Sequence, residues 1–410
     1  MSKINCGIDA LAFCGPAAYL DLSDLAAARG VDPAKYLKGL GQRGMAIATP
    51  CEDTVTMAAE AAERALKNFD IDPAEIGTLI VGTETGIDHS KPVAVYVHEI
   101  LGLDARCRTF ETKHACYGAM AGLTASMDWI AAGRARGRKA LVIASDIARY
   151  GLNTPGEPTQ GAGAVAMVVS DAPRLVSIDP GTIGDYTRQV MDFWRPLYSK
   201  YAFADGHYSI QCYLDALTGA RTDAVGDRVD LLEQLAACLY HVPFVKMAFK
   251  AHQRQLEIEH GGPVSKDHHD AWMQLSESFG RLVAPWLELN AEIGNIYTGS
   301  LFLALIDLLR QADASLEGRD ISLFSYGSGC GATFCLGRIE AGASTWRARL
   351  DPADDLARRR RLSMAEYEDL VRAAEESDAV PTLEPAAYGL PPGRLYYTGT
   401  REHQRQYQRL

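Results

Sequence analysis

The chain has 410 residues, of which 47% are hydrophobic and 23% charged, with a formal net charge of −11. This length is sufficient to bury the cores of two domain-sized units. The acidic balance argues against general binding to nucleic acid or to an anionic membrane surface, although it allows a local basic pocket for an anionic ligand. No apolar run approaches the roughly 18 residues that a transmembrane helix needs, and the first ten residues lack the pattern of a signal peptide.

Nine cysteines are scattered through the chain without a CxxC pair. We therefore expect a reducing cytoplasm rather than a disulfide-bonded, exported protein. The sequence also lacks an HExxH motif, an EF-hand loop and any clustered set of metal ligands, so we predict no metal site.

The first part of the chain alternates helix-like and strand-like segments. Residues Asp53–Asn68 predict a helix, because an acidic start that can cap it precedes an Ala-rich body. The alternation then continues in chain order as a strand over 78–82, a helix over 91–101, a strand over 107–112, a helix over 116–132, and strands over 139–144 and 164–169. This order predicts an α/β protein in which helices cover central sheets.

The second part repeats this alternation less clearly. Apolar patterning predicts helices over 231–239, 243–255 and 301–312, and a buried strand over 321–325. Two α/β halves indicate an internal duplication, and we place their boundary so that residues 1–172 form the N-terminal half and 173–410 the C-terminal half. The charged segment 351–361 favours a solvated surface helix, with a specific anion site as the alternative. We expect 380–392 to be a surface excursion.

Lys113–Ala119 places a cysteine between a predicted strand and a predicted helix. Cys116 would therefore lie at or near a helix N-terminus, where unpaired backbone N–H groups and the macrodipole favour a thiolate. A thiolate in that position is a competent nucleophile toward a thioester. A buried structural cysteine is the alternative, and it is the role that we expect for the other cysteines.

Two further side chains can carry acid–base chemistry. Glu84 follows the strand predicted over 78–82, at the edge where open α/β sheets bind ligands, so its carboxyl could act as a general acid or base. Capping of the next helix is the alternative role of Glu84. His241 lies beside Pro243 at a structured turn, where an imidazole either polarises a carbonyl oxygen or serves as a satisfied structural group.

Several other residues are candidates for ligand contact. Lys246 and Lys250 are four residues apart on a predicted helix and share one face, which suits the phosphates of a coenzyme as well as plain solvent. Asn295 precedes a helix and could donate a hydrogen bond to an acyl carbonyl. The Gly-rich turns 161–164 and 327–331 allow a ligand to approach the backbone closely, and neither has phosphate-loop spacing.

Together these segments resemble the hydroxymethylglutaryl-CoA synthase family, a branch of the thiolase-like condensing enzymes. The resemblance covers nearly the whole chain and rests on blocks that occur in the same order, at 82–88, 113–118, 148–167, 191–196, 241–247, 294–300 and 324–330. Departures from the family pattern are slight. His114 stands where glutamine or glutamate is expected, and Met120 replaces a smaller residue.

The resemblance implies a role for each matching residue. Cys116 matches the nucleophile that takes the acetyl group, and Glu84 matches the general acid/base that assists carbanion formation. His241 matches the residue that holds and polarises the acceptor carbonyl. Asn295 matches a contact to the acceptor acyl group, and Ser328 matches part of the acyl pocket.

The remaining matches are less direct. Lys246 and Lys250 match the face that meets pantetheine and nucleotide, and Asp146 and Thr159 match residues near the reaction centre. The implied fold is a duplicated thiolase-like α/β fold with five αβαβα layers, assembled as a homodimer. No bound cofactor is implied, because every group that the reaction needs is an ordinary side chain and the acyl thioester is the substrate.

Two branches of this family share the site. One condenses acetyl-CoA with acetoacetyl-CoA in mevalonate formation, and the other adds a β-branch to a β-ketoacyl chain on an acyl carrier protein during polyketide assembly. Some blocks resemble the first branch and others the second, and we favour the CoA-using branch. A thiolase or a ketoacyl-carrier synthase is a weaker alternative. A non-catalytic binding protein of the same fold is the remote alternative, and the joint presence of Cys116, Glu84 and His241 argues against it.

Overall fold

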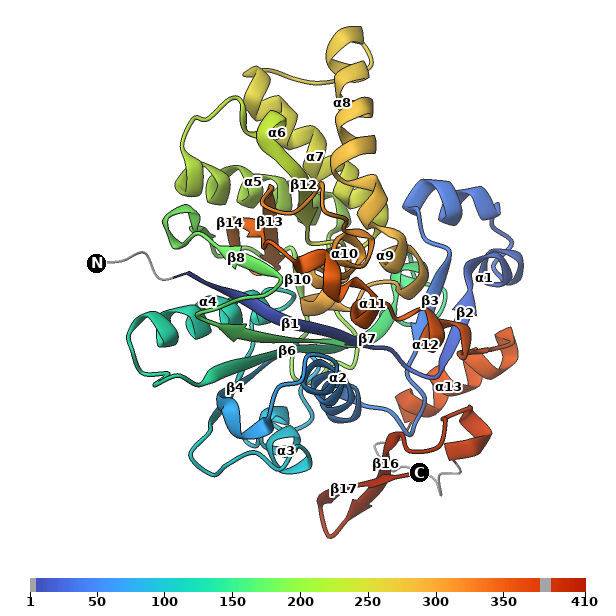
Figure 1. Cartoon of the computed structure of the whole chain (residues 1–410). Coiled ribbons are helices and arrows are strands. Elements are labelled where there is room, and N and C mark those ends of the chain that lie inside the picture. Colours follow the sequence, from blue (N-terminus) through green and yellow to red (C-terminus); the bar gives the residue numbers. More distant parts are fainter. Residues whose placement is uncertain (1–4, 377–384) are drawn as a thin grey trace.

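The computed structural model describes residues 5–376 and 385–410. Within these ranges ten strands form one mixed sheet in the order β12-β13-β14-β8-β1-β7-β6-β4-β5, with β9 paired to β14 (Figure 1). These strands are β1 (Cys6–Cys14), β4 (Ile76–Gly82), β5 (Arg108–Thr112), β6 (Lys139–Ala148), β7 (Gly161–Ser170), β8 (Val176–Ile178), β9 (Gly184–Thr187), β12 (Leu235–Tyr240), β13 (Asp320–Gly327) and β14 (Gly331–Ile339).

Helices surround this sheet, and three small sheets lie outside it. The helices are α1 (Leu22–Ala28), α2 (Thr54–Asn68), α3 (Val93–Ile100), α4 (Gly118–Ala131), α5 (Gly206–Val225), α6 (Leu231–Gln234), α7 (Val245–His260), α8 (His269–Leu282), α9 (Glu288–Ile293), α10 (Ser300–Gln311), α11 (Arg347–Leu350), α12 (Ala353–Ala357) and α13 (Met364–Glu376). The small sheets contain β2 (Ala18–Asp21), β3 (Gly44–Ile47) and β15 (Arg360–Arg361), then β10 (Phe193–Trp194) and β11 (Phe203–Ala204), and finally β16 (Leu395–Arg401) and β17 (Gln404–Arg409).

Helices cover both faces of the N-terminal strands. A Cβ at Gly122 of α4 would touch Ile80 of β4 and Val142 of β6, so α4 packs on the face that carries these two side chains. Successive side chains of a strand point to opposite faces, and Ser145 of β6 donates a hydrogen bond to Thr54 of α2. Helix α2 therefore lies on the other face, and the expected α/β architecture is confirmed.

Helix α10 lies at the centre of the molecule. Its residues 300–309 are all buried, as expected for a helix that packs on every side. It contacts β1 as well as β12 and β13, which come from opposite sides of the predicted boundary at 172. Strand β8 follows that boundary and pairs with both β1 and β14, so strands of both halves form one sheet.

Most predicted elements are present, but the prediction of a helix over 231–239 is wrong. Helix α6 ends at Gln234, and Leu235–Tyr240 is a strand that pairs in parallel with β13. A strand buried on both faces has a continuous apolar sequence, which periodicity alone does not separate from a buried helix.

The charged segment 351–361 is also not one surface helix. It forms the short helix α12 and then β15, which pairs with β2. Residues 377–384 lie outside the described residues, so only part of the expected excursion over 380–392 is visible, as a 3₁₀ turn over Pro385–Tyr388.

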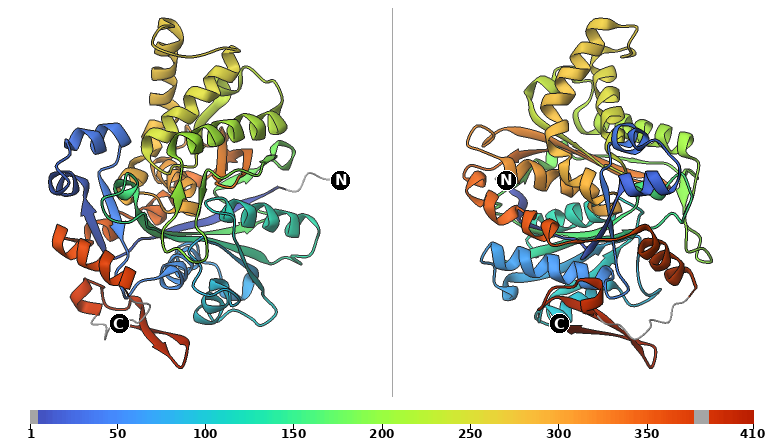
Figure 2. Two further views of the ribbon diagram at one scale, coloured as in Figure 1. Left: turned by 180° about the vertical axis from the view of Figure 1, so that it is seen from behind. Right: turned by 90° about the vertical axis from the view of Figure 1, so that its right-hand side faces the viewer.

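The last described segment returns to the N-terminal half. Strands β16 and β17 form a hairpin that lies beside α2 and α3 in both views of Figure 2. Asp53, the N-cap of α2, accepts hydrogen bonds from Arg405 at 2.7 Å and from Tyr407 at 2.8 Å. Among the described helices, none is long and apolar enough to cross a membrane.

Candidate active site

The nucleophile candidate lies on the turn between β5 and α4. Helix α4 begins at Gly118 with Tyr117 as its N-cap, so Cys116 immediately precedes the cap. The turn before it requires a left-handed residue, and Ala115 adopts φ +41°. Gly82 at the end of β4 allows α4 to approach, because a Cβ there would lie 2.3 Å from the backbone nitrogen of Ala119. The sequence around Cys116 therefore brings the cysteine to the carboxyl end of β4.

Cys116 and Glu84 face each other at that end of the sheet. The thiol Sγ lies 3.4 Å from Oε1 of Glu84 and donates to it. Burial raises the pKa of the Cys116 thiol well above its ordinary range, and the Glu84 carboxyl raises it further. Burial, assisted by Asp146, raises the pKa of Glu84 to about 8. The pKa of Cys116 is therefore shifted upward, whereas a helix N-terminus alone would lower it. The resting side chain is a thiol beside the Glu84 carboxyl, which can accept its proton when ionised.

Asp146 at the end of β6 holds the Glu84 turn. One oxygen of its fully buried carboxylate accepts from the backbone N–H groups of Glu84 at 2.9 Å and Thr85 at 3.1 Å. The same oxygen accepts from the hydroxyl groups of Thr83 at 2.9 Å and Thr85 at 2.5 Å. The other oxygen accepts from the N–H and hydroxyl of Thr298 at 3.2 and 2.5 Å. Asp146 thus positions the turn that carries Glu84.

His241 enters the site from the end of β12. Its backbone N–H donates to Phe324 at 2.7 Å, and its carbonyl accepts from the hydroxyl of Tyr213 at 2.8 Å. The side chain is 3% exposed, and burial lowers the pKa of the imidazole to about 3. A neutral imidazole in this place can donate a hydrogen bond to a carbonyl oxygen but does not supply a positive charge.

A cavity of about 320 Å³ is lined by Cys116 and His241, whereas Glu84 is not among its lining residues. Cys116, His241 and Ser328, which were predicted separately from the sequence, all line this cavity. Its walls are largely apolar. The remaining lining residues are Phe193, Ala204, Gly206, His207, Ser209, Ile210, Tyr213, Pro243, Phe244, Met247 and Tyr326. An apolar cavity with a few convergent polar groups is the form of a small-molecule binding site.

Aromatic side chains that sequence reasoning did not assign surround Cys116. The rings of Tyr150, Phe193 and Tyr297 lie 6.1 to 6.2 Å apart with edge-to-face angles, and they pack with Cys116 in one cluster. The blocks that carry the family resemblance include all three residues, which was the only available signal, because they come from segments far apart in the sequence.

The Ser328 turn is fixed by a second buried carboxylate that was not assigned a role. Asp192 is fully buried and accepts from the N–H of Gly329 at 2.9 Å and from the hydroxyl of Tyr326 at 2.6 Å. His114 packs against the same turn, since a Cβ at Gly331 would lie 2.4 Å from its ring. His114 thus fills space beside the turn that carries Ser328.

Asn295 and Thr159 lie behind the aromatic cluster rather than in the cavity wall. Asn295 is 2% exposed, and its amide donates to the hydroxyl of Tyr150 at 3.1 Å while its oxygen accepts from Tyr297 and Ser300. Its backbone N–H donates to the carbonyl of Thr159 at 3.0 Å.

The two lysines also lie outside the lining of the cavity. They stand on α7, the helix next to Phe244 that also carries Met247, both of which line the cavity. Lys246 is exposed with its ammonium 4.2 Å from the centre of the Phe249 ring, and Lys250 is partly buried.

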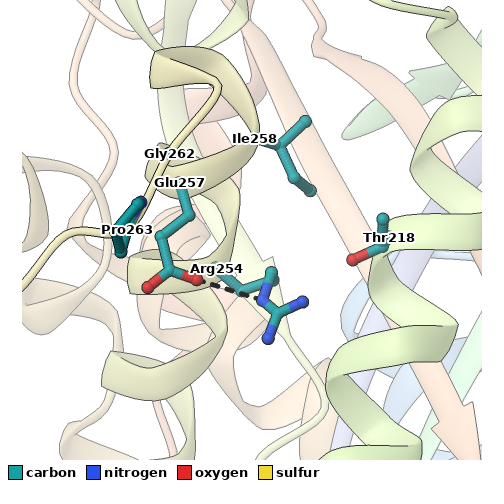
Figure 3. Close-up of a pocket in the computed structure, with 6 residues that line it drawn as sticks. All are labelled: Thr218, Arg254, Glu257, Ile258, Gly262 and Pro263. Atoms are coloured by element: carbon teal, nitrogen blue, oxygen red, sulfur yellow. Dashed lines mark ion pairs between the residues drawn. The ribbon is translucent and has the colours of Figure 1, made fainter.

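A second cavity lies apart from these residues. It opens between α5 and α7 and is lined by Thr218, Arg254, Glu257, Ile258, Gly262 and Pro263 (Figure 3). Arg254 and Glu257 pair with each other there at 3.1 Å, and none of the candidate site residues lines it. In the described ranges no group of three or more potential ligands is placed to hold a metal ion.

Comparison with known proteins identifies relatives over the full chain. The model of the hydroxymethylglutaryl-coenzyme A synthase N-terminal domain matches residues 2–173, and that of the C-terminal domain matches 176–261 and 252–409. A hydroxymethylglutaryl-CoA synthase of Enterococcus faecalis is 38% identical over 92% of this chain and 94% of its own. The polyketide biosynthesis 3-hydroxy-3-methylglutaryl-ACP synthase PksG of Bacillus subtilis is 35% identical over 90% and 89%.

A solved structure shares the fold throughout. It is that of MvaS in complex with 3-hydroxy-3-methylglutaryl coenzyme A, which is 47% identical with a TM-score of 0.91 and covers all of both chains. Agreement over the full length confirms the expected duplicated thiolase-like α/β fold.

Proposed function

Because this chain belongs to the hydroxymethylglutaryl-CoA synthase family, we propose that it joins an acetyl thioester to a β-ketoacyl thioester through an acetyl group on Cys116. The observation that carries this proposal is the 3.4 Å contact of Cys116 with Glu84 beside the cavity that also contains His241. An acyltransferase of this kind needs a nucleophile, a proton acceptor and a group that binds the acceptor carbonyl. Cys116 and His241 line the cavity, and Glu84 contacts Cys116 from outside its lining.

The first step transfers the acetyl group to the protein. Glu84, when ionised, accepts the proton of the Cys116 thiol as Sγ attacks the acetyl carbonyl. The new S–C bond forms, the bond to the donor sulfur breaks, and the donor leaves as a thiol after taking the proton. The raised pKa of Glu84, about 8, suits a group that accepts and returns protons near neutrality.

The second step forms the carbon–carbon bond. The Glu84 carboxylate removes a proton from the acetyl methyl group, and that carbon attacks the ketone of the acceptor, whose oxygen His241 binds. The resulting alkoxide takes up the proton. Water then cleaves the bond between Cys116 and the product, which restores the thiol and releases a carboxylate.

We favour coenzyme A over a carrier protein as the carrier of both acyl groups. The similarity to the MvaS structure in complex with 3-hydroxy-3-methylglutaryl coenzyme A supports this choice. Arg360 and Arg361 of the charged segment 351–361 pair with Glu366 and Asp24, which partly offsets the positive charge that this segment presents to an acidic carrier protein. The similarity to PksG keeps the carrier-protein reaction as the second candidate.

Intact-protein mass spectrometry separates these candidates. We expect rapid addition of one acetyl group from acetyl-CoA, none on Cys116→Ala, and an unchanged adduct on Cys107→Ala, which removes a buried thiol outside the cavity. Rapid loading only from an acetylated carrier protein would establish the second candidate. An adduct that persists on Cys116→Ala, or none from either donor, would contradict the covalent mechanism.

Three further properties are proposals that follow the same family membership. We propose that the protein works without a bound cofactor, in the cytoplasm and as a homodimer. Nine free thiols are compatible with a reducing compartment. The edge strand β5 leaves one side of the main sheet unpaired within a single described chain, which supports association of two copies. Light scattering of the purified protein tests the dimer directly.

A further inference from the structure

A buried hydrogen-bond chain connects the far C-terminal helix α13 to the aromatic cluster around Cys116. Tyr367 of α13 is fully buried, and its hydroxyl accepts from the side-chain amide of Gln160 at 2.8 Å. The amide oxygen of Gln160 accepts from the backbone N–H of Tyr150 at 2.8 Å. The hydroxyl of Tyr150 in turn accepts from Asn295 at 3.1 Å. Each connection is made by a different segment of the chain.

The outer end of this chain is held by an ion pair. The hydroxyl of Tyr367 donates at 3.2 Å to Glu157, which is 2% exposed. Arg29 binds the two oxygens of Glu157 through Nη2 at 2.7 Å and Nε at 3.0 Å, and it also reaches Glu368 of α13 at 2.6 Å. A bidentate guanidinium–carboxylate contact fixes both distance and orientation.

Together these contacts hold residues 149–160, the loop between β6 and β7, at both of its ends. Glu157 also accepts from the backbone N–H of Asn153 at 3.0 Å, so the middle of the loop is tied to the same carboxylate. The loop has little regular structure, only the 3₁₀ turn Glu157–Thr159, and therefore depends on such contacts for its position. It delivers the ring of Tyr150 to the cluster with Cys116.

We infer that Tyr367 is a positioning residue, which sets Tyr150 and Asn295 through Gln160 although it lies outside the cavity. This inference rests on the proposed function, with the acceptor acyl group bound in the cavity beside the aromatic cluster that Asn295 supports through the hydroxyl of Tyr150. Without the hydroxyl of Tyr367, the side-chain N–H of Gln160 loses its acceptor and Glu157 loses a donor, so the loop gains freedom. Cys116 and Glu84 keep their own contacts from β4, β5 and β6. Binding of the acceptor is then impaired more than acetylation.

The test compares Tyr367→Phe with Ser278→Ala, which removes a buried hydroxyl that also makes two hydrogen bonds, to His252 and Leu275, far from the loop. Both variants are expected to lose similar stability in thermal unfolding. We expect Tyr367→Phe alone to raise the KM of the acceptor about fivefold or more, with acetylation of Cys116 within twofold of wild type. Hydrogen exchange over 149–160 should be faster in Tyr367→Phe and unchanged in Ser278→Ala.

A double variant separates positioning from general weakening. In an Asn295→Ala background, Tyr367→Phe is expected to add no further increase in acceptor KM, since both act through one contact. Kinetics and loop exchange in Tyr367→Phe equal to those of Ser278→Ala, or a fully additive double variant, would overturn the role while wild-type turnover stands. A wild-type protein that forms no acetyl adduct would instead overturn the proposed function together with this role.

Discussion

The carboxylate of Asp146 and the hydroxyl of Thr298, 152 positions apart in the chain, share a 2.5 Å hydrogen bond inside the molecule. The same carboxylate receives the N–H groups of the turn that carries Glu84. A residue that precedes α10 therefore helps to fix the acid/base candidate at the end of β4, and the contact crosses between the two halves of the fold.

Replacing Thr298 with valine tests this connection. Valine keeps the shape but removes the donor, so the buried carboxylate loses one of its hydrogen bonds, which costs about 1–3 kcal/mol of stability. We expect a lower Tm and a slower acetylation step, because the Glu84 turn is less well held. The conservative Thr298→Ser variant should restore both, and equal acetylation rates in Thr298→Val and wild type would show that Asp146 holds the Glu84 turn without Thr298.

The pKa of Glu84 predicts the pH dependence of acetylation. Glu84 accepts the thiol proton only when it is ionised, and its pKa is raised to about 8. The rate of acetyl-adduct formation is therefore expected to rise with pH through about 8. Glu84→Gln should lose this rise and reduce turnover by roughly 10²–10⁴-fold, the usual contribution of a general base. A rate that is flat from pH 6 to 9 in wild type would contradict the assignment.

The same pKa has a consequence for stability. Because the native pKa of Glu84 exceeds its ordinary value of 4.5, native Glu84 retains a proton that the unfolded chain has lost between these values. The stabilising contribution is complete below pH 4.5 and disappears as the pH rises through about 8. The Tm of Glu84→Gln should therefore rise relative to the Tm of wild type between pH 5 and 9. A Tm difference that stays constant over this range would contradict the raised pKa.

His241 is expected to act as a neutral hydrogen-bond donor. Burial lowers the pKa of its imidazole to about 3, so it should not titrate in rate profiles above pH 5. Substitution with alanine is expected to leave acetylation of Cys116 nearly unchanged and to raise the KM of the acceptor about tenfold, the equivalent of one hydrogen bond. Loss of acetylation in His241→Ala would instead assign it to activation of the thiol, and stopped-flow loading assays distinguish the two.

Lys246 offers a test of the anionic carrier. It is exposed on α7 beside residues that line the cavity. Lys246→Glu is expected to raise the KM of acetyl-CoA severalfold with little change in kcat, and the effect should shrink as salt is added. Lys67→Glu, the same change in the last turn of α2, should have no effect, and equal behaviour of the two variants would exclude Lys246 from the carrier path.

Local sequence patterns predicted the elements that carry Cys116 and Glu84. Glu84 follows a strand with an apolar run and a terminal glycine, and Cys116 precedes an Ala-rich helix. They failed at Leu235–Tyr240, where a buried strand has no periodicity to separate it from a helix. The pKa direction of Cys116 was also beyond local reasoning. It depends on Glu84, 32 positions away, and on burial by side chains from distant segments.

The partners of Asp146, Asn295 and Tyr150 were beyond reach for the same reason. Hydrogen bonds that span 145 or 152 positions leave no periodic trace in a single sequence. Family resemblance matched Asp146 and Asn295 to positions near the reaction centre or the acceptor, but only the folded chain shows that neither lines the cavity and that both support other side chains.

The contacts between α2 and the hairpin β16–β17 can form only late in the synthesis of the chain. Asp53 caps α2, yet two of its hydrogen-bond donors, Arg405 and Tyr407, are synthesised 352 and 354 positions later. Thr54, next to that cap, contacts the Glu84 turn through the carbonyl of Thr85. A nascent N-terminal half can build its strands early, but α2 receives these two hydrogen bonds only after residue 407 has been synthesised. A chain clipped before residue 395 would keep all the proposed reacting groups and lose this brace.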